Sequence, residues 1–336
     1  MAAPLPLAGV DAIASAYGLG AVRECRVVAE GVLNRNWRLV TDAGAFALKE
    51  LDQTSPDDAR RSLALMVSVA ADGVPVVAAV PTGSGKSVLE LGVHAYYLAP
   101  WIDGDHRRGA EMTRATAFHM GEVLARVRLA LARPGLLPEA APRFEPPPTV
   151  ATASERIGDY LRLIDGRDAP DEFDRAVAPL LRTRLDLVAA NEHQRPSEDG
   201  FTGPHGWTHG DCQNWNLLWR DDRIAAVLDW DRVRVNPYAE EIVRAATYQC
   251  ALADGSLDLD HLAAVVAGYR TFAPIGGEAL LDAARRRWWK LLTSVWHLKY
   301  HYFLGNNAGD WLFFSDERLL RWWTDHLHEV ESTLAG

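Results

Sequence analysis

The side chains that could carry chemistry gather in one stretch, Trp207 to Glu241. His209-Gly210-Asp211 follows extended sequence, and Asn216 comes five residues after Asp211. Next comes a predicted hairpin, whose second strand returns Asp229 to the side of Asn216. The hairpin is predicted from two short apolar runs that flank a polar turn, Leu217–Trp219 and Ile224–Leu228. Three oxygen-bearing side chains, those of Asp211, Asn216 and Asp229, are thus predicted to meet.

A small set of oxygen ligands without a His or Cys cluster suits Mg²⁺, which takes one or two protein ligands together with substrate phosphates. A separate carboxylate ahead of those ligands can hold the attacking hydroxyl in a phosphoryl transfer. The alternative is that these residues are turn and cap residues of a surface hairpin, because Asp and Asn favour turns. The complete ordered set favours phosphoryl transfer.

This order of residues resembles the catalytic segment of the aminoglycoside phosphotransferases, choline kinases and homoserine-kinase-like enzymes, which are relatives of the protein kinases. The matching sequences are HGDCQNWN at 209–216 and LDWD at 228–231. The resemblance implies that Asp211 is the catalytic base or orients the acceptor hydroxyl. It also implies that Asn216 and Asp229 are Mg²⁺ ligands.

Further residues of the segment receive supporting roles from the same resemblance. They are His209, which steadies the loop, Asp231, and Glu240 as the acidic member of Pro237-Tyr238-Ala239-Glu240. Gln213 stands where protein kinases carry a lysine. This difference favours a small molecule over a protein as substrate.

The N-terminal half resembles the nucleotide-binding part of the family. Glu30–Trp37 looks like its nucleotide-loop hairpin, with Gly31 and Asn34 as nucleotide contacts. Lys49, in FALKEL at 46–51, stands where the family keeps its phosphate-contacting lysine, although it could also be a solvent-facing strand lysine. Ala95–Trp101 resembles the hinge that binds the base of ATP or GTP. The hinge residues expected at the nucleotide are Tyr97, Ala99 and Trp101.

One feature departs from the family pattern. The family's inserted helix normally supplies a Glu that pairs with the strand lysine, but no Glu lies between Leu51 and Leu89. Either Asp57 or Asp58 takes its place, or Lys49 is held in another way.

The elements that position these residues suggest an α+β, two-lobed, protein-kinase-like fold. The expected division is an N-terminal nucleotide-binding lobe at 1–101 and a helical lobe at 102–336, the latter carrying the catalytic segment 207–241 and the substrate pocket. For the first lobe we predict helices at 7–18 and 55–71 and strands at 23–29, 36–41, 46–51, 76–80 and 88–98. Gly83-Ser84-Gly85-Lys86-Ser87 ends like a phosphate-binding loop but lacks the leading Gly, so it is predicted to be a turn. For the second lobe we predict helices at 112–131, 154–164 and 171–192, with a Pro-rich connector at 138–148.

Aromatic residues are concentrated in the C-terminal third. Trp288, Leu291, Leu292, Val295 and Trp296 follow helical spacing, and such a stripe is usually core. The alternative is a wall for a ring-bearing substrate. The better candidates for a substrate pocket are Arg286, Trp289, His297 and His301.

Composition narrows the class of protein. The chain has 336 residues, with 35 Lys plus Arg against 45 Asp plus Glu, which gives a net charge of −10. So acidic a chain is a poor candidate for binding nucleic acid or an anionic membrane. Three cysteines without a CxxC pattern, and a start without a basic signal region, are typical of a cytoplasmic protein.

We therefore predict transfer of the γ-phosphate of ATP or GTP to a hydroxyl of a small molecule, with Mg²⁺. The first choice of acceptor is an antibiotic, an aminoglycoside or another sugar-containing or nucleoside natural product, so that the enzyme confers resistance. The alternative is a metabolite kinase of the homoserine, choline or sugar type. A pseudokinase that only binds is the third choice, supported by the missing helix Glu. The sequence leaves the acceptor, the preferred nucleotide and the oligomeric state open.

Overall fold

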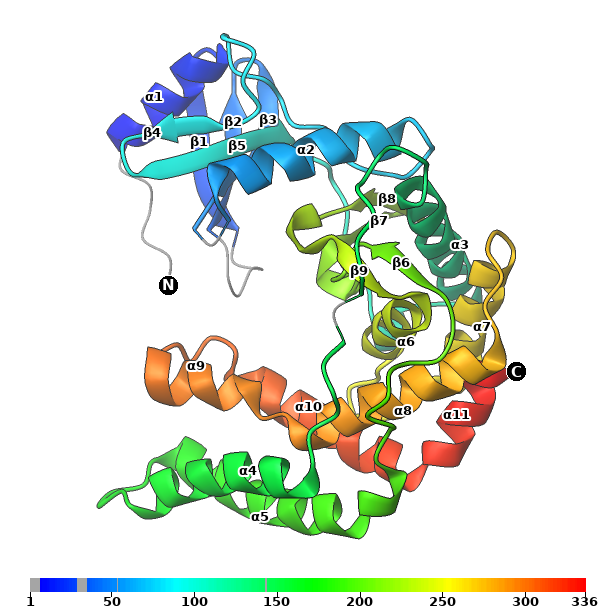
Figure 1. Ribbon diagram of the computed structural model, residues 1–336. Helices are drawn as coiled ribbons and strands as arrows, with labels where there is room; N and C mark the ends of the chain where they lie inside the picture. The colour runs from blue at the N-terminus through cyan, green and yellow to red at the C-terminus, as the bar shows by residue number, and fades with distance from the viewer. Residues whose placement is uncertain (1–6, 29–34, 53, 143) are drawn as a thin grey trace. The chain divides into compact units, whose positions relative to one another are not determined.

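The computed structural model describes residues 7–28, 35–52, 54–142 and 144–336. They form two compact units, coloured by residue number in Figure 1. The first unit comprises the described residues up to Arg107 together with Val123–Glu139 and Trp207–Arg234. The second comprises Arg108–Glu122, Ala140–Gly206 and Val235–Gly336. A lobe boundary after residue 101 stays a prediction.

A five-stranded antiparallel sheet forms the centre of the first unit, with the strand order β1-β2-β3-β5-β4 (Figure 1). Its first three strands, which the sequence predicts, pair in chain order as an antiparallel meander, and Gly44 closes the turn between the second and third with a φ of 127°. The strands are β1 (Val22–Val28), β2 (Asn36–Thr41), β3 (Gly44–Glu50), β4 (Leu89–Leu91) and β5 (His94–Pro100).

Two helices accompany this sheet. Helix α1 (Leu7–Tyr17) packs Ile13 and Tyr17 into a core made with Trp37, Leu39 and Leu98 of the strands. Helix α2 (Pro56–Ala70) begins as its sequence predicts. The Ser55 hydroxyl accepts a hydrogen bond from the Asp58 amide at 3.1 Å, and Pro56 occupies the first turn.

Two strand predictions for this unit were wrong. Residues 76–80 form no strand, because among them only Val80 pairs with the sheet, through an isolated bridge to Leu98. Just before them, the Pro75 carbonyl accepts a hydrogen bond from the Val227 amide instead. The predicted strand 88–98 is a hairpin of β4 and β5, because Gly92 adopts a φ of 62° and reverses the chain. The glycine turn that was predicted after residue 82 is present, with the Thr82 amide bonded to the Lys86 carbonyl at 2.8 Å.

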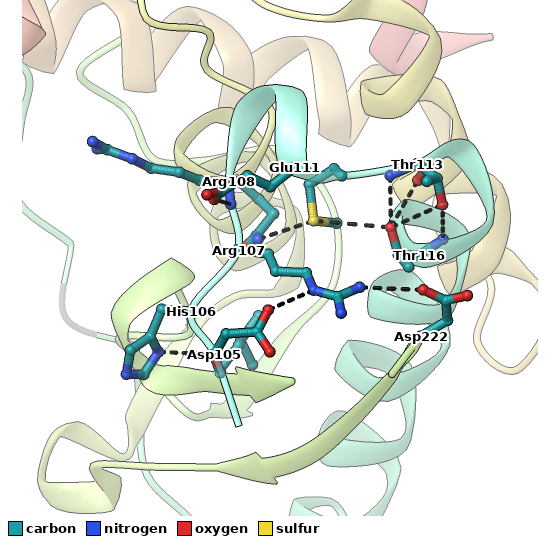
Figure 2. A network of polar contacts seen from close by, with 11 residues as sticks. Asp105, His106, Arg107, Arg108, Glu111, Thr113, Thr116 and Asp222 are labelled. Carbon is teal, nitrogen blue, oxygen red and sulfur yellow. Dashed lines mark hydrogen bonds and ion pairs between the residues drawn. The ribbon is translucent and has the colours of Figure 1, made fainter. Parts of the chain in front are cut away.

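Helix α3 (Arg114–Leu131) begins two residues later than predicted. Figure 2 shows the reason at the start of the helix, where Thr113 and Thr116 face each other. The Thr113 amide donates to Oγ1 of Thr116 at 2.8 Å, and the Thr116 amide donates to Oγ1 of Thr113 at 3.2 Å. This reciprocal pair satisfies amides that the preceding turn leaves without helical partners.

The segment 207–234 contributes short elements to the first unit. Strands β7 (Leu217–Arg220) and β8 (Arg223–Val227) form the predicted hairpin, with Leu217 opposite Val227. Strands β6 (His205–Thr208) and β9 (Arg234–Pro237) form a separate two-stranded sheet. Single 3₁₀ turns lie at η3 (Asn214–Asn216) and η4 (Trp230–Arg232).

The second unit is helical (Figure 1). The expected helix at 154–164 begins earlier, at Val150, because the Thr149 hydroxyl caps the Thr152 amide at 3.1 Å. The helices of the second unit are α4 (Val150–Asp165), α5 (Glu172–Ala190), α6 (Tyr238–Gln249), α7 (Leu259–Arg270), α8 (Gly277–Thr293), α9 (Trp296–Leu304), α10 (Asp310–Asp325) and α11 (Leu327–Ala335). Its 3₁₀ turns are η1 (Gly109–Glu111) and η2 (Glu192–Gln194).

The C-terminal aromatic stripe is not one helix. Helix α8 ends at Thr293 and α9 begins at Trp296. At this break the buried Arg184 guanidinium donates hydrogen bonds to the carbonyls of Leu291 and Ser294, at 2.9 and 2.7 Å. Trp288 is fully buried, as the core interpretation expects, whereas Trp296 is 45% exposed.

These elements confirm the predicted α+β fold class, a small antiparallel sheet with a larger helical part. Among the residues that the structure describes, none of the helices combines the length and the apolar character that crossing a membrane requires.

Candidate active site

The β7–β8 hairpin brings Asn216 and the residue before Asp229 together. The Leu228 amide donates to the Asn216 carbonyl at 2.8 Å, just beyond the last strand pair. Asp229 itself adopts the left-handed conformation, with φ 61° and ψ 67°. Few residues other than Gly tolerate this conformation, but Asp is one of them. The chain therefore turns sharply at Asp229.

The loop His209–Asn216, which we call the HGD loop, is tied to the same place. The Asn216 side-chain amide donates to the Asp211 carbonyl at 2.8 Å. Gly210 has a φ of 80°, and a Cβ atom there would lie 2.1 Å from the Arg232 carbonyl oxygen. The HGD loop thus passes so close to the η4 backbone that only glycine fits at position 210.

His209 steadies this arrangement. Its ring is fully buried and packs edge-on against the Trp230 ring, with 4.8 Å between centroids. Its Nε2 lies 3.0 Å from the Leu228 carbonyl oxygen, so Nε2 must carry the proton of this hydrogen bond. His209 therefore links the HGD loop to the end of β8, one residue before Asp229.

Lys49 joins the site from β3. Only 8% of the residue is exposed, so it is not a solvent-facing lysine. Its Nζ lies 2.7 Å from Oδ1 of Asp229 and 3.1 Å from Oδ2 of Asp231. The Thr54 hydroxyl donates to the same Asp231 oxygen at 3.3 Å. An ammonium ion and two carboxylates are thus gathered within the first unit.

Burial and neighbouring charges shift the pKa values of Lys49 and Asp229 in opposite directions. Burial by itself lowers the pKa of the Lys49 ammonium, but Tyr97, Asp229 and Asp231 together raise it above its ordinary value. Burial likewise raises the pKa of the Asp229 carboxyl, but the Lys49 charge outweighs it and holds that pKa below its usual range. Both groups are therefore charged at neutral pH.

The two aspartates of α2 do not replace the missing Glu. Asp57 is bonded to Arg60 at 2.7 Å, and Asp58 is bonded to Arg61 and to the Ser55 hydroxyl. Both are exposed on the first turn of the helix. Of the two alternatives that the sequence left open, the structure shows the second, in which Lys49 is held by the Asp229-Trp230-Asp231 segment.

The predicted hinge, Ala95–Trp101, forms most of β5 and the residue after it. In the sheet, Tyr97 lies opposite Lys49 and Ala99 lies opposite Ala47. The Trp101 amide donates a hydrogen bond to the Ala45 carbonyl at 2.9 Å. Gly31 and Asn34 of the predicted nucleotide loop lie outside the described residues.

The segment after the hinge is fixed to the β7–β8 hairpin. The Asp105 and Trp219 backbones exchange hydrogen bonds of 2.9 and 2.8 Å. Figure 2 shows Arg107 between two carboxylates, Asp105 at 2.9 Å and Asp222 at 3.2 Å. The sheet and the HGD loop are thereby joined within one unit.

The donor set near Asp229 suits a hard divalent cation. Because the Asn216 Nδ2 is used by the Asp211 carbonyl, its Oδ1 remains to accept or to ligate. That amide oxygen and the ionised Asp229 are typical of Mg²⁺, which needs few protein ligands. Among the described residues no group of three or more His, Cys, Asp or Glu side chains forms a metal cage.

The predicted substrate residues lie in the second unit, and so does Glu240, in the first turn of α6. Trp289 is buried, and its indole N–H donates to the Pro148 carbonyl at 2.9 Å. Arg286 is bonded to Asp282 and to the Ser197 and Gly200 carbonyls. His297 lies 3.1 Å from Asp316, and His301 lies 2.8 Å from Asp310. Each therefore has a structural contact, and a pocket role for them stays a prediction.

Sequence reasoning missed one residue that contacts the site, Thr54. Thr54 carries no motif, and only its contact with Asp231 reveals it.

Comparison with known proteins agrees with this geometry. A family model described as the phosphotransferase enzyme family, APH, matches residues 24–275. A homoserine kinase of Methylobacillus flagellatus is 25% identical over 279 residues, 81% of this chain and 80% of that protein. A homoserine kinase of Pseudomonas aeruginosa (strain UCBPP-PA14) is 25% identical over 295 residues, 85% of each chain.

Solved structures share the fold. Spectinomycin phosphotransferase in complex with ADP and spectinomycin has a TM-score of 0.68 at 12% identity, covering 95% of each chain. A microcompartment-associated aminopropanol kinase has a TM-score of 0.62 at 16% identity, covering 98% of this chain and 99% of its own. The protein-kinase-like fold that the sequence suggested is therefore present. The family model spans most of the chain, so the chain belongs to the phosphotransferase enzyme family and is a phosphotransferase with an alcohol group as acceptor.

Proposed function

We propose that the chain transfers the γ-phosphoryl group of ATP to a hydroxyl of a small metabolite. The observation that carries this is the position of Lys49 between Asp229 and Asp231, beside the HGD loop. In the reaction the acceptor oxygen bonds to the γ-phosphorus, the bond from that phosphorus to the β–γ bridging oxygen breaks, and ADP leaves. The proton of the acceptor hydroxyl passes to a carboxylate.

Asp211 is the carboxylate we assign to that proton. Its side chain is 14% exposed, and Nε of Arg232 lies 3.8 Å from its Oδ2. The carboxylate is therefore partly exposed to solvent. The Asn216 amide donates to the Asp211 carbonyl and so fixes the backbone from which the carboxylate projects.

Asn216 and Asp229 are the residues that would hold Mg²⁺. When bound, the ion neutralises charge on the β- and γ-phosphates. In our proposal Lys49 releases its contact with Asp229 and turns to the phosphate oxygens. A compact ammonium on a flexible stem suits this exchange.

ATP is our first choice of nucleotide and GTP the second. The spectinomycin phosphotransferase was solved with ADP, and an amicoumacin kinase, with a TM-score of 0.57, was solved with AMP-PNP and Ca²⁺. Tyr97, Ala99 and Trp101 on β5 and its end, with Gly31 and Asn34, are the residues we expect at the nucleotide.

The acceptor we favour is homoserine or a similar small hydroxylated metabolite. This reverses the order expected from the sequence, because the curated relatives cited are homoserine kinases that match four fifths of the chain or more. An antibiotic acceptor, and with it a resistance role, is the second candidate. The two antibiotic kinases cited share only 12% and 14% identity with this chain, which supports the fold rather than the acceptor.

A coupled assay of ADP and GDP release tests this proposal. ATP or GTP is supplied with Mg²⁺ and one acceptor at a time, namely homoserine, choline, spectinomycin or an aminoglycoside. Homoserine-dependent ADP release is expected. Release with an antibiotic alone, together with resistance of a sensitive bacterium that expresses the chain, favours the second candidate. Nucleotide binding without release for any acceptor favours a pseudokinase.

A further inference from the structure

The turn η4 packs against helix α2 within the first unit, and α2 contains no Glu. From this turn Asp231 reaches the sheet, where its Oδ2 lies 3.1 Å from the Nζ atom of Lys49. A carboxylate for the strand lysine, absent from the helix, is thus supplied by the turn that lies against the helix.

The position of Asp231 is fixed by contacts other than the one to Lys49. The Thr54 hydroxyl donates to Oδ2 of Asp231 at 3.3 Å, and this is the same oxygen that Lys49 contacts. The preceding residue, Trp230, is buried, and its indole N–H donates to the Val227 carbonyl at 2.9 Å. The protein itself therefore holds both the backbone and the carboxylate of Asp231 in place.

The two carboxylates at Lys49 differ in exposure. The Asp229 side chain is 31% exposed and that of Asp231 only 18%, whereas the Lys49 side chain is 10% exposed. Asp229 is also the residue that is expected to hold Mg²⁺, and a divalent cation competes with the ammonium for its oxygens. An ammonium as buried as that of Lys49 is costly without an acidic partner. A second carboxylate is therefore needed when Asp229 is engaged elsewhere.

We propose that Asp231, supported by Thr54, is the anchor of Lys49, which keeps the ammonium in place while Asp229 holds the metal. This inference rests on the proposed function, since it concerns the nucleotide site of that kinase. An ammonium has three hydrogens to donate, so one bond to Asp231 leaves two for phosphate oxygens. Asp231 is accordingly a positioning residue that acts through Lys49, and it is not a second metal ligand.

A double-mutant cycle on nucleotide binding tests this assignment. Calorimetry measures the binding of AMP-PNP with Mg²⁺ to the wild type, to Lys49→Met, to Asp231→Asn and to the double variant. Asp231→Asn is expected to weaken binding by about 10- to 100-fold, the range for hydrogen bonds to a charged group, and by no more than Lys49→Met does. In the Lys49→Met background the same substitution is expected to cost less than about twofold, because no ammonium is left to position.

Two further variants separate positioning from folding. Thr54→Val removes only the hydroxyl that donates to Asp231, and it is expected to weaken binding by about two- to fivefold, again only when Lys49 is present. This milder change tests the inference even if Asp231→Asn does not fold. Asp57→Asn, which changes an exposed aspartate in the first turn of α2, is the control and is expected to bind AMP-PNP as the wild type does.

The outcomes distinguish this inference from the proposed function. Equal losses with and without Lys49 would mean that Asp231 acts by itself, as a metal ligand or a structural residue does, and that result overturns the inference. The expected cycle in a protein that phosphorylates no acceptor supports the inference and contradicts the proposed function. Phosphoryl transfer together with wild-type affinity in Asp231→Asn does the reverse. A wild type that binds no AMP-PNP overturns both.

Discussion

The Lys49 ammonium lies 2.7 Å from Oδ1 of Asp229, although 180 positions of sequence separate the two residues. The same ammonium reaches Asp231 at 3.1 Å. In the family that the sequence resembles, a Glu on the inserted helix pairs with this lysine. The inserted helix α2 of this chain has no Glu. Here the acidic segment after β8 supplies both carboxylates, so the position of Lys49 depends on the segment that also carries the predicted metal ligand.

Lys49→Arg is expected to impair the enzyme although the charge is kept. A planar guanidinium cannot replace a compact ammonium between two carboxylates and a phosphate. Losing a hydrogen bond to a charged group costs about 1.5–3 kcal/mol, so kcat/KM for ATP is expected to fall by about 10- to 150-fold. Steady-state kinetics check this. Lys86→Arg, in the exposed turn of the same unit, is the control, and equal kinetics for the two variants would contradict the assignment.

The buried Tyr17 hydroxyl is expected to make the stability of the protein fall at alkaline pH. Burial raises the pKa of its hydroxyl from 10.0 to about 12. The folded state therefore holds this proton more tightly than the unfolded state does. Its contribution to stability is complete below pH 10 and is lost as the pH rises toward 12. Tyr17→Phe has no such proton. As the pH rises from 10 to 12, the unfolding temperature of the wild type is therefore expected to fall more than that of the variant. A constant difference from pH 8 to 12 would show that Tyr17 ionises as freely folded as unfolded.

Sequence reasoning succeeded where the chemistry is local. Turn and strand patterns were enough to predict the β7–β8 hairpin, whose end bonds the Leu228 amide to the Asn216 carbonyl, while the roles of Asp211, Asn216 and Asp229 stay predictions. It could not identify Asp231 as a partner of Lys49, because that pairing depends on how β3 and η4 pack. The hairpin at Gly92 was missed because a single glycine in an apolar run signals a turn only weakly.

Gly210→Ala is expected to disrupt the HGD loop. A left-handed φ costs a residue with a side chain about 1–2 kcal/mol, and the new Cβ would also lie 2.1 Å from the Arg232 carbonyl oxygen. Gly85 has the same φ of 80° but nothing within 4 Å of its Cβ position. Gly85→Ala therefore measures the conformational cost alone. Chemical denaturation of both variants is expected to show a larger loss for Gly210→Ala, with loss of activity in that variant only.

Asp229→Ala is expected to abolish turnover and to weaken Mg²⁺-dependent nucleotide binding. It removes a predicted metal ligand and leaves Lys49 with Asp231 as its acidic partner. Nucleotide titration with and without Mg²⁺ separates the two effects: the wild type is expected to bind more tightly with Mg²⁺, and the variant is expected to lose most of that difference. A variant that stays folded and keeps near-wild-type activity would remove Asp229 from the metal site.

Asp211→Asn bears most directly on the mechanism. The substitution keeps the size of the side chain and removes its ability to accept a proton from the acceptor hydroxyl. The HGD loop is expected to keep its shape, because Asn216 holds the Asp211 backbone carbonyl rather than its side chain. Nucleotide affinity is therefore expected to stay within about threefold, since Lys49, Asn216 and Asp229 are unchanged.

The rate of phosphoryl transfer is expected to respond differently from binding in Asp211→Asn. In a loose transition state little proton transfer is needed early, so orientation of the hydroxyl is the larger share of the effect. General-base and orienting effects together are worth roughly 10²–10⁴ in rate, and kcat is expected to fall by that range. The acceptor KM should change far less than kcat, because the interaction matters most in the transition state. Calorimetric nucleotide binding beside steady-state turnover, both on the same variant, checks this. If binding and activity fall in proportion, Asp211 acts on the loop or the metal, and full activity would exclude it as the catalytic carboxylate.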